Sequence, residues 1–151
     1  MYSFFGKTEL KIDVKGRVFI PSHYRKQLLE KGDERLVLRK NEGGDFLDLY
    51  TESVWEQEID LVESKLNLFD DDDYLFYMQY TSSADLLEMD ASGRILIPKK
   101  YLEKIRLESE VMLLGVARKI ALWNKESYSQ SMISDVDFAR LKKQKLGGKL
   151  K

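Results

Sequence analysis

Two arginines that each follow a glycine are the residues of this chain best suited to binding an anion. They are Arg17, after Gly16, and Arg94, after Gly93. A guanidinium is planar and keeps its charge, and it can hold a phosphate, or the O6 and N7 edge of a guanine, with two hydrogen bonds. Because glycine readily adopts the left-handed backbone conformation that closes a three-residue hairpin loop, both arginines are expected just after a tight turn.

An aspartate stands four residues before each of these arginines. In a hairpin with a three-residue loop, Asp13 would lie opposite Arg17 and Asp90 opposite Arg94, so each carboxylate could orient its guanidinium. The alternative is a plain hairpin ion pair, which is common and contributes under roughly 1 kcal/mol when exposed. Lys15 adds a second positive charge to the first turn and favours contact with a phosphate there.

The two turns belong to a longer internal repeat. Residues 13–24 align with residues 90–101 without a gap, and the two segments share the pattern D-x-x-G-R-x-x-I-P-x-x-Y. Both prolines of the chain, Pro21 and Pro98, occupy equivalent positions in it, which chance similarity of two short segments would seldom produce. Self-similarity of this kind indicates two copies of one structural unit.

Each copy is expected to form a strand, a tight turn, a strand, a short helix and a second hairpin. Apolar residues alternate with polar ones before each turn, as in a half-buried strand; they are Leu10, Ile12 and Val14, and Leu87, Met89 and Ala91. Each proline can open a helix, on which apolar residues fall four positions apart as Tyr24 with Leu28 and Tyr101 with Ile105. The second hairpins are expected over 36–39 with 46–50, and over 111–116 with 120–123.

A strongly acidic segment lies between the copies. Its apolar residues have helical spacing and predict an amphipathic connector; they are Val54, Trp55, Ile59, Val62, Leu66, Leu68 and Phe69. The aspartates at 70–73 are suited to capping a helix over 74–80, whose uncharged side chains predict a buried or partner-facing helix. A Ca²⁺ loop starting at Asp70 would need glycine and glutamate where the chain has Leu75 and Thr81, so no metal site is predicted.

Composition and charge narrow the class of protein. The net charge of −1 argues weakly against nucleic acid, but basic residues gather between 7 and 26, while acidic ones between 52 and 73 mask them. The chain has no cysteine and one histidine, His23, which lies in no serine or cysteine constellation. No stretch approaches the roughly 20 apolar residues of a membrane helix, so we expect no membrane partner and a cytoplasmic protein.

The doubled D-x-x-G-R-x-x-I-P pattern resembles the AbrB-like swapped-hairpin DNA-binding modules of bacteria. Two copies in one chain, the opening Phe-Gly and the helix around Trp55 together resemble the MraZ family over nearly the whole chain apart from the tail. The resemblance implies a mainly β fold with short helices, in which two interleaved AbrB-like repeats form a double-split β-barrel. It also implies a ring-like homo-oligomer that binds direct repeats in the promoter of its own division and cell-wall gene cluster.

By the same resemblance, the D-x-x-x-R segments carry the contacts with double-stranded promoter DNA. The expected DNA-binding residues are Lys15, Arg17 and Arg94, with Arg25 and Lys26 just after the Ile-Pro step, and the residues that hold the turns are Asp13, Gly16, Asp90 and Gly93. Where the first copy has Lys15, Arg25 and Lys26, the second has Ser92, Leu102 and Glu103. The first copy is therefore expected to dominate binding.

The chain is expected to divide into four segments. They are an AbrB-like DNA-binding repeat at 7–54, a helical connector at 55–83, a second repeat at 84–127, and a C-terminal helix with a basic tail at 128–151. The leading interpretation is a sequence-specific, nucleoid-associated transcriptional regulator that has no cofactor, metal or small-molecule substrate and is not an enzyme. One alternative is an antitoxin-type DNA-binding partner of a toxin, although such relatives usually carry one copy and a long disordered extension. The other is an enzyme or metal-dependent scaffold.

Overall fold

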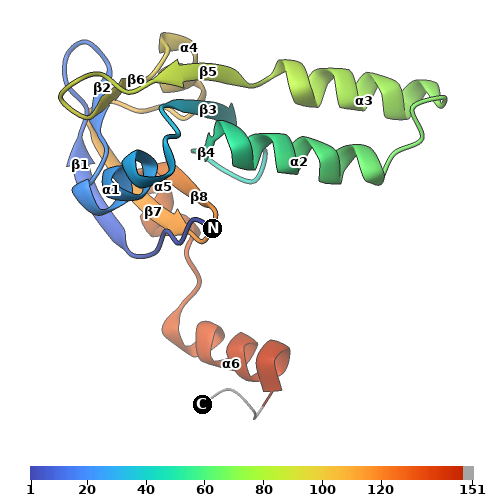
Figure 1. Ribbon diagram of the computed structural model, residues 1–151. Coiled ribbons are helices and arrows are strands. Elements are labelled where there is room, and N and C mark those ends of the chain that lie inside the picture. The colour runs from blue at the N-terminus through green and yellow to red at the C-terminus, as the bar shows by residue number, and fades with distance from the viewer. Residues whose placement is uncertain (148–151) are drawn as a thin grey trace.

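The computed structural model describes residues 1–147, so the end of the basic tail at 148–151 lies outside the described residues. Two equivalent series of elements follow one another along the chain (Figure 1). The first series is β1 (Lys7–Lys11), β2 (Arg17–Phe19), α1 (Ser22–Lys31), β3 (Arg35–Lys40), β4 (Phe46–Thr51) and α2 (Glu52–Ser64). The second is β5 (Asp85–Glu88), β6 (Arg94–Leu96), α4 (Lys99–Lys104), β7 (Glu110–Val116), β8 (Lys119–Asn124) and α5 (Lys125–Ser131). Helix α3 (Asp71–Ser82) lies between the series, and α6 (Asp135–Leu146) follows the second.

The two repeats exchange strands rather than folding separately. The six-stranded sheet has the order β1-β7-β8-β4-β3-β5, so β1 of the first repeat pairs with β7 of the second, and β5 of the second pairs with β3 of the first. The order is unchanged when the repeats are swapped, because each strand then takes the place of its equivalent. A pseudo-two-fold axis therefore runs between β4 and β8.

A two-stranded ribbon, formed by β2 and β6, closes the open side of this sheet. Val18 lies opposite Ile95 at its centre, one residue from each repeat. Strand β1 contacts β2, and β5 contacts β6, so the ribbon spans the two edges of the sheet and leaves a split at each. The fold is thus mainly β with short helices and is made of two interleaved repeats, as predicted.

The core is shared equally by the repeats. Equivalent side chains from both are almost completely buried in one cluster, in the pairs Val18 and Ile95, Ile20 and Ile97, Tyr24 and Tyr101, and Leu28 and Ile105. Burying one large apolar side chain is worth about 1.5–3 kcal/mol. Since neither repeat encloses a core of its own, the ribbon and its two turns are held in place by the whole domain.

The strand before each tight turn is shorter than the sequence pattern predicts. Strand β1 ends at Lys11, and Ile12 is half-buried, but Val14 is fully exposed in the turn. Ala91 is likewise exposed after β5. The prediction that Val14 and Ala91 continue the buried face of a strand is therefore wrong, because both residues lie within the three-residue loops that reverse the chain.

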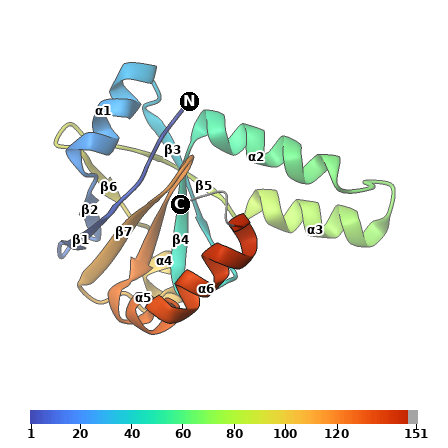
Figure 2. The ribbon, with the colours of Figure 1, turned by 90° about the horizontal axis from the view of Figure 1, so that it is seen from below.

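Helices α2 and α3 form an arm that projects from the barrel (Figures 1 and 2). Trp55 anchors its base, with its ring 5.2 Å from that of Tyr50 and stacked 5.7 Å from that of Tyr80. Asp70 caps α3, as predicted, by accepting a hydrogen bond from the Asp73 amide.

Two expectations about the arm are corrected by the structure. Helix α2 ends at Ser64, so Leu66, Leu68 and Phe69 belong to the loop that follows it. No residue of α3 is buried, which excludes the buried alternative for this helix and leaves the partner-facing one. Within residues 1–147, no helix is long and apolar enough to cross a membrane.

Candidate nucleic-acid interface

Both D-x-x-G-R segments form the predicted three-residue turn. Gly16 and Gly93 have φ of +89° and +87°, a region that side chains other than glycine rarely occupy. In the first turn the Asp13 amide donates to the Arg17 carbonyl at 3.0 Å, and in the second the Asp90 amide donates to the Arg94 carbonyl at 2.8 Å. The two turns are therefore built alike by the backbone.

The aspartates complete each turn through their carboxylates. Asp13 Oδ1 accepts hydrogen bonds from the amides of Lys15 and Arg17, at 2.9 and 2.8 Å. Asp90 Oδ1 accepts equivalent bonds from the amides of Ser92 and Arg94, both at 2.9 Å. Each aspartate thus fixes the backbone that presents its arginine.

The two arginines differ in what holds their guanidinium groups. Arg17 Nε donates to Asp13 Oδ2 at 2.8 Å, so this carboxylate also orients the side chain. Asp90 uses its carboxylate to accept from the Ser92 hydroxyl at 2.7 Å instead. The guanidinium carbon of Arg94 lies 5.6 Å from the centre of the Phe19 ring, in a cation–π contact. Arg17 is therefore oriented by its own repeat and Arg94 by the other.

The ribbon presents both arginines on one face. Side chains alternate along a strand, so Val18 and Ile95 point into the core with no exposed surface. Arg17, Phe19, Arg94 and Leu96 alternate with them and point outward, and Phe19 and Leu96 are exposed. Arg17 lies opposite Leu96, and Phe19 opposite Arg94, which puts the two arginines at the two ends of a ribbon three residues long.

Each turn is also bonded to the other repeat. The Ile20 amide donates to the Gly93 carbonyl, and the Ile97 amide donates to the Gly16 carbonyl, both at 2.9 Å. These symmetric bonds tie each glycine to the strand end that follows the other turn. The spacing of the two arginines is consequently set by the barrel rather than by flexible loops.

Arg25 is packed against the second turn. Its Nε donates to the Ile20 carbonyl at 2.8 Å, and its guanidinium carbon lies 4.9 Å from the centre of the Phe19 ring. A Cβ atom at Gly93 would come within 2.6 Å of Arg25 Cδ. Sequence reasoning missed this packing and the role of Phe19 beneath two arginines. The outward position of an aromatic residue in β2 was the signal that could have indicated it.

The other predicted basic residue of α1 has a different environment. Lys26 is exposed at the surface of the helix, next to half-buried Arg25. In α4, Leu102 takes the place of Arg25 and packs against the first turn, so that a Cβ at Gly16 would lie 3.5 Å from its Cδ1. The turns therefore have equivalent packing partners of different charge.

Hydrogen bonds to the turns lower the pKa values of both aspartates. For Asp13 the main cause is the bond from the Arg17 amide, followed by the bond from the Arg17 side chain. For Asp90 it is the bond from the Arg94 amide, followed by that from the Ser92 hydroxyl. Each ionised carboxylate thus stabilises the folded state above its unfolded pKa of about 3.9, and this contribution is lost as the pH falls through the lower folded value.

We expect the stability of the turns to depend on pH in this range. Asp13→Asn combined with Asp90→Asn should lower the melting temperature at pH 7. The difference from wild type should shrink as the pH falls through the lowered pKa values of the two carboxylates, because their protonation removes the same charge. Thermal unfolding followed by circular dichroism at several pH values measures the difference. Asp60→Asn, on the exposed side of α2, is the matched control. A difference that stays constant over this range would contradict the assignment.

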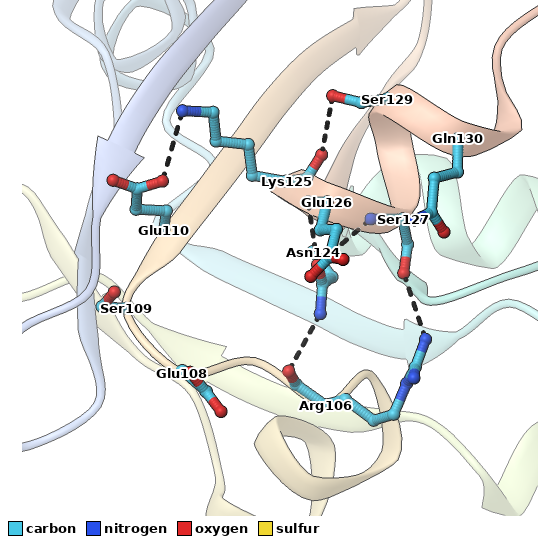
Figure 3. Close-up of a pocket in the computed structure, with 10 residues that line it drawn as sticks. All are labelled: Arg106, Glu108, Ser109, Glu110, Asn124, Lys125, Glu126, Ser127, Ser129 and Gln130. Carbon is cyan, nitrogen blue, oxygen red and sulfur yellow. Dashed lines mark hydrogen bonds and ion pairs between the residues drawn. The ribbon is translucent and has the colours of Figure 1, made fainter.

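A polar hollow beside α5 is lined by side chains that form hydrogen bonds and ion pairs within the protein (Figure 3). Asn124 caps α5 and donates to the carbonyls of Ile105 and Arg106, at 3.0 and 2.9 Å. Arg106 pairs with Asp45 at 2.6 Å, and Lys125 pairs with Glu9 and Glu110. These polar groups therefore have hydrogen-bond and ion-pair partners within the protein, and their contacts join α5 to the barrel. Within residues 1–147, no cluster of three or more histidine, aspartate or glutamate side chains is arranged to hold a metal ion.

The fold consists of two interleaved repeats with paired D-x-x-G-R turns, which is the arrangement that the resemblance to AbrB-like swapped-hairpin modules implies. The sequence model of the family described as "MraZ protein, putative antitoxin-like" matches residues 3–86 and, a second time, residues 80–145. The chain therefore belongs to the MraZ family, as its doubled motif predicts.

Relatives with the name Transcriptional regulator MraZ match over most of this chain. The protein of Bacteroides thetaiotaomicron is 40% identical over 138 residues, which cover 91% of this chain and 88% of the relative. That of Bacteroides fragilis is 42% identical over 126 residues, covering 83% and 80%, and that of Phocaeicola vulgatus is 36% identical over 137 residues, covering 91% and 89%. The chain is accordingly a transcriptional regulator.

Proposed function

We propose that this regulator binds double-stranded promoter DNA with the outward face of the β2–β6 ribbon and its two turns. The observation that supports the proposal most strongly is the placement of Arg17 and Arg94 on one face, each presented by a turn bonded to both repeats. Binding then requires little ordering of the protein, because the donors are already positioned. A three-residue ribbon between two turns is also narrow enough for the major groove.

The contacts divide into reading and positioning roles. Arg17, oriented by Asp13, reads a base edge, and Arg94 makes the equivalent contact from the second turn. Lys15 and Lys26 are exposed and contact phosphates, which fixes the register on the duplex. Half-buried Arg25 holds Phe19 and the second turn and adds positive charge beside them. The first repeat dominates, because Ser92 and Glu103 replace the two lysines in the second.

The proposed target is the promoter of the chain's own gene cluster for division and the cell wall. Whole chains associate into a ring, and the identical ribbons around it bind direct repeats in that promoter. The protein acts in the cytoplasm, associated with the nucleoid. In this arrangement residues 7–54 and 84–127 form the DNA-binding repeats, joined by the helical connector at 55–83. Footprinting of the purified protein on DNA upstream of its own gene tests the target directly, and absence of any protected repeat would refute it.

Repeat spacing provides a prediction about the assembled form. Ribbons at regular intervals around a ring bind best when the DNA repeats recur on one face of the duplex, at about one helical turn or 10 base pairs. Inserting about half a turn between two repeats should weaken binding at least tenfold, because one repeat then faces away from its ribbon. Electrophoretic mobility shifts with matched DNA lengths measure this. Equal affinity for both spacings would mean that the subunits bind independently.

A second candidate function is that of an antitoxin-type partner of a toxin, which the wording of the family description favours. The presence of two repeats in one chain argues against it. Purification of the tagged chain from its own organism, followed by mass spectrometry, would reveal a stoichiometric toxin if this second function were correct.

A further inference from the structure

The side of α3 that faces away from α2 is apolar and uncovered. Tyr80 packs on Trp55 of α2, which defines the inner side of the helix. The opposite side, called here the outer face of α3, consists of Tyr74, Leu75, Met78 and Gln79 at helical spacing. Leu75 is 56% exposed and Met78 47% exposed. A helix with no buried residue and an apolar outer face is typical of an element that packs against a partner.

The charge along α3 is confined to one end. Asp71 and Asp72 are exposed in the first turn, beside the capping residue Asp70. From residue 74 to the end of the helix there is no charged side chain. The outer face therefore runs from an acidic N-terminal end to an uncharged, apolar remainder.

Helix α6 has the complementary arrangement. Phe138, in its first half, is 61% exposed, and half-buried Leu141 lies on the same side of the helix three residues later. From residue 140 onwards it carries Arg140, Lys142, Lys143 and Lys145, all exposed, of which Lys142 and Lys145 lie on the same side as Phe138. Like α3, it has no buried residue, and both helices are 12 residues long, or about 18 Å.

Only one relative orientation of α3 and α6 brings opposite charges together and also brings the apolar side chains of the two helices together. In an antiparallel pair, Lys142 and Lys145 of α6 meet Asp71 and Asp72. Phe138 and Leu141, on the same side of α6, then meet Met78 and Leu75. The acidic first turn of α6 then faces the uncharged end of α3. A parallel pair would bring together two acidic first turns. Antiparallel helix dipoles add to the preference.

We propose that α6 of one chain packs antiparallel on the outer face of α3 of a second copy of the chain. The two helices of one chain are held apart, because only Met132 and Ile133 separate α5 from the capping residue of α6. Three residues of extended chain span about 10 Å, so α6 remains at the α5 end of the barrel while the arm projects from its side (Figure 1).

Such a contact joins two different surfaces, the arm of one chain and the C-terminal helix of the next. Contacts of this type are heterologous and form a closed ring when the rotation between neighbours closes. The inference therefore rests on the self-association in the proposed function and identifies the surfaces that make it, but it does not depend on DNA binding.

Charge reversal in the full-length protein tests the contact. Asp71→Lys with Asp72→Lys, or Lys142→Glu with Lys145→Glu, should each reduce the mass measured by light scattering at micromolar concentration from a multiple of 17.7 kDa towards a single chain. The chain that carries all four substitutions should regain most of the wild-type mass, because the attraction is restored with reversed signs. Circular dichroism of each variant establishes that it is folded.

Glu30→Lys with Glu34→Lys, on exposed residues away from both helices, is the matched control and should assemble like wild type. If wild type is a single chain throughout, self-association itself is wrong and the contact with it. If wild type assembles and both reversals leave its mass unchanged, only the α3–α6 contact is overturned. The contact is also overturned if Lys142→Glu with Lys145→Glu weakens promoter binding at unchanged mass, since α6 would then bind DNA.

Discussion

Arg17→Ala is expected to reduce promoter affinity by roughly 1–3 kcal/mol per site, or about 5- to 150-fold, with little loss of folding stability. The substitution removes the guanidinium that the first turn presents, whereas the backbone bonds of Asp13 to that turn remain. Within the protein, the side chain of Arg17 forms a half-exposed ion pair with Asp13, and such pairs contribute little to stability. In an oligomer that binds several repeats, the loss would recur at each site.

Two further variants separate the roles within the turns. Asp13→Ala should lower the melting temperature more and the affinity less than Arg17→Ala, because its carboxylate caps two amides but would repel phosphate. Arg94→Ala should have an intermediate effect on affinity, since its turn carries Ser92 in place of Lys15.

Fluorescence anisotropy with promoter DNA at one salt concentration and thermal melting would measure both quantities, because electrostatic affinity is comparable only at matched salt. Normal binding by Arg17→Ala together with weak binding by Arg94→Ala would reverse the assignment of the dominant repeat. Normal binding by both would exclude the ribbon as the DNA contact.

The local structure of the turns could be predicted because it depends on residues close in sequence. Glycine at a left-handed position and an aspartate three residues earlier are sufficient to define a three-residue loop, and both turns have this geometry. Because the motif occurs twice, the sequence also indicated that the second turn has the same conformation as the first and presents an arginine in the same way. The interleaving of the strands came from family resemblance alone, because strand alternation does not specify which repeat supplies a partner.

The packing of Arg25 could not be predicted from its own neighbourhood. Its contact residue Gly93 is far away in sequence, and the two meet only because the β2–β6 ribbon is built from both repeats. From sequence, a basic residue on a short helix favours the exposed side. Similarly, the residues of α3 predicted a helix, but they did not decide whether its uncharged side chains are buried within the chain or face a partner. That depends on which surfaces of the helix the rest of the chain covers.

The packing of Arg25 leads to the second large expected effect, on stability. Gly93→Ala should destabilise the fold by roughly 1–3 kcal/mol for a side chain at φ of +87°. It should also displace Arg25, because the new Cβ would lie 2.6 Å from Arg25 Cδ, and the bond to the Ile20 carbonyl would be lost. A hydrogen bond from a charged donor is worth roughly 1.5 kcal/mol or more. At about 2–4 °C per kcal/mol, the melting temperature should fall by several degrees.

A double-mutant cycle separates these two causes. In an Arg25→Ala background the displaced contacts are already absent, so Gly93→Ala should cost only the backbone strain, and the two substitutions should together destabilise less than the sum of each alone. The first turn offers the matched comparison, because a Cβ at Gly16 meets the Ile97 carbonyl at 3.3 Å and Leu102 only at 3.5 Å. Leu102→Ala should therefore relieve Gly16→Ala very little. Strictly additive melting temperatures in the Arg25–Gly93 cycle would show that Arg25 does not hold the second turn, and its basic charge would then have to act on DNA directly.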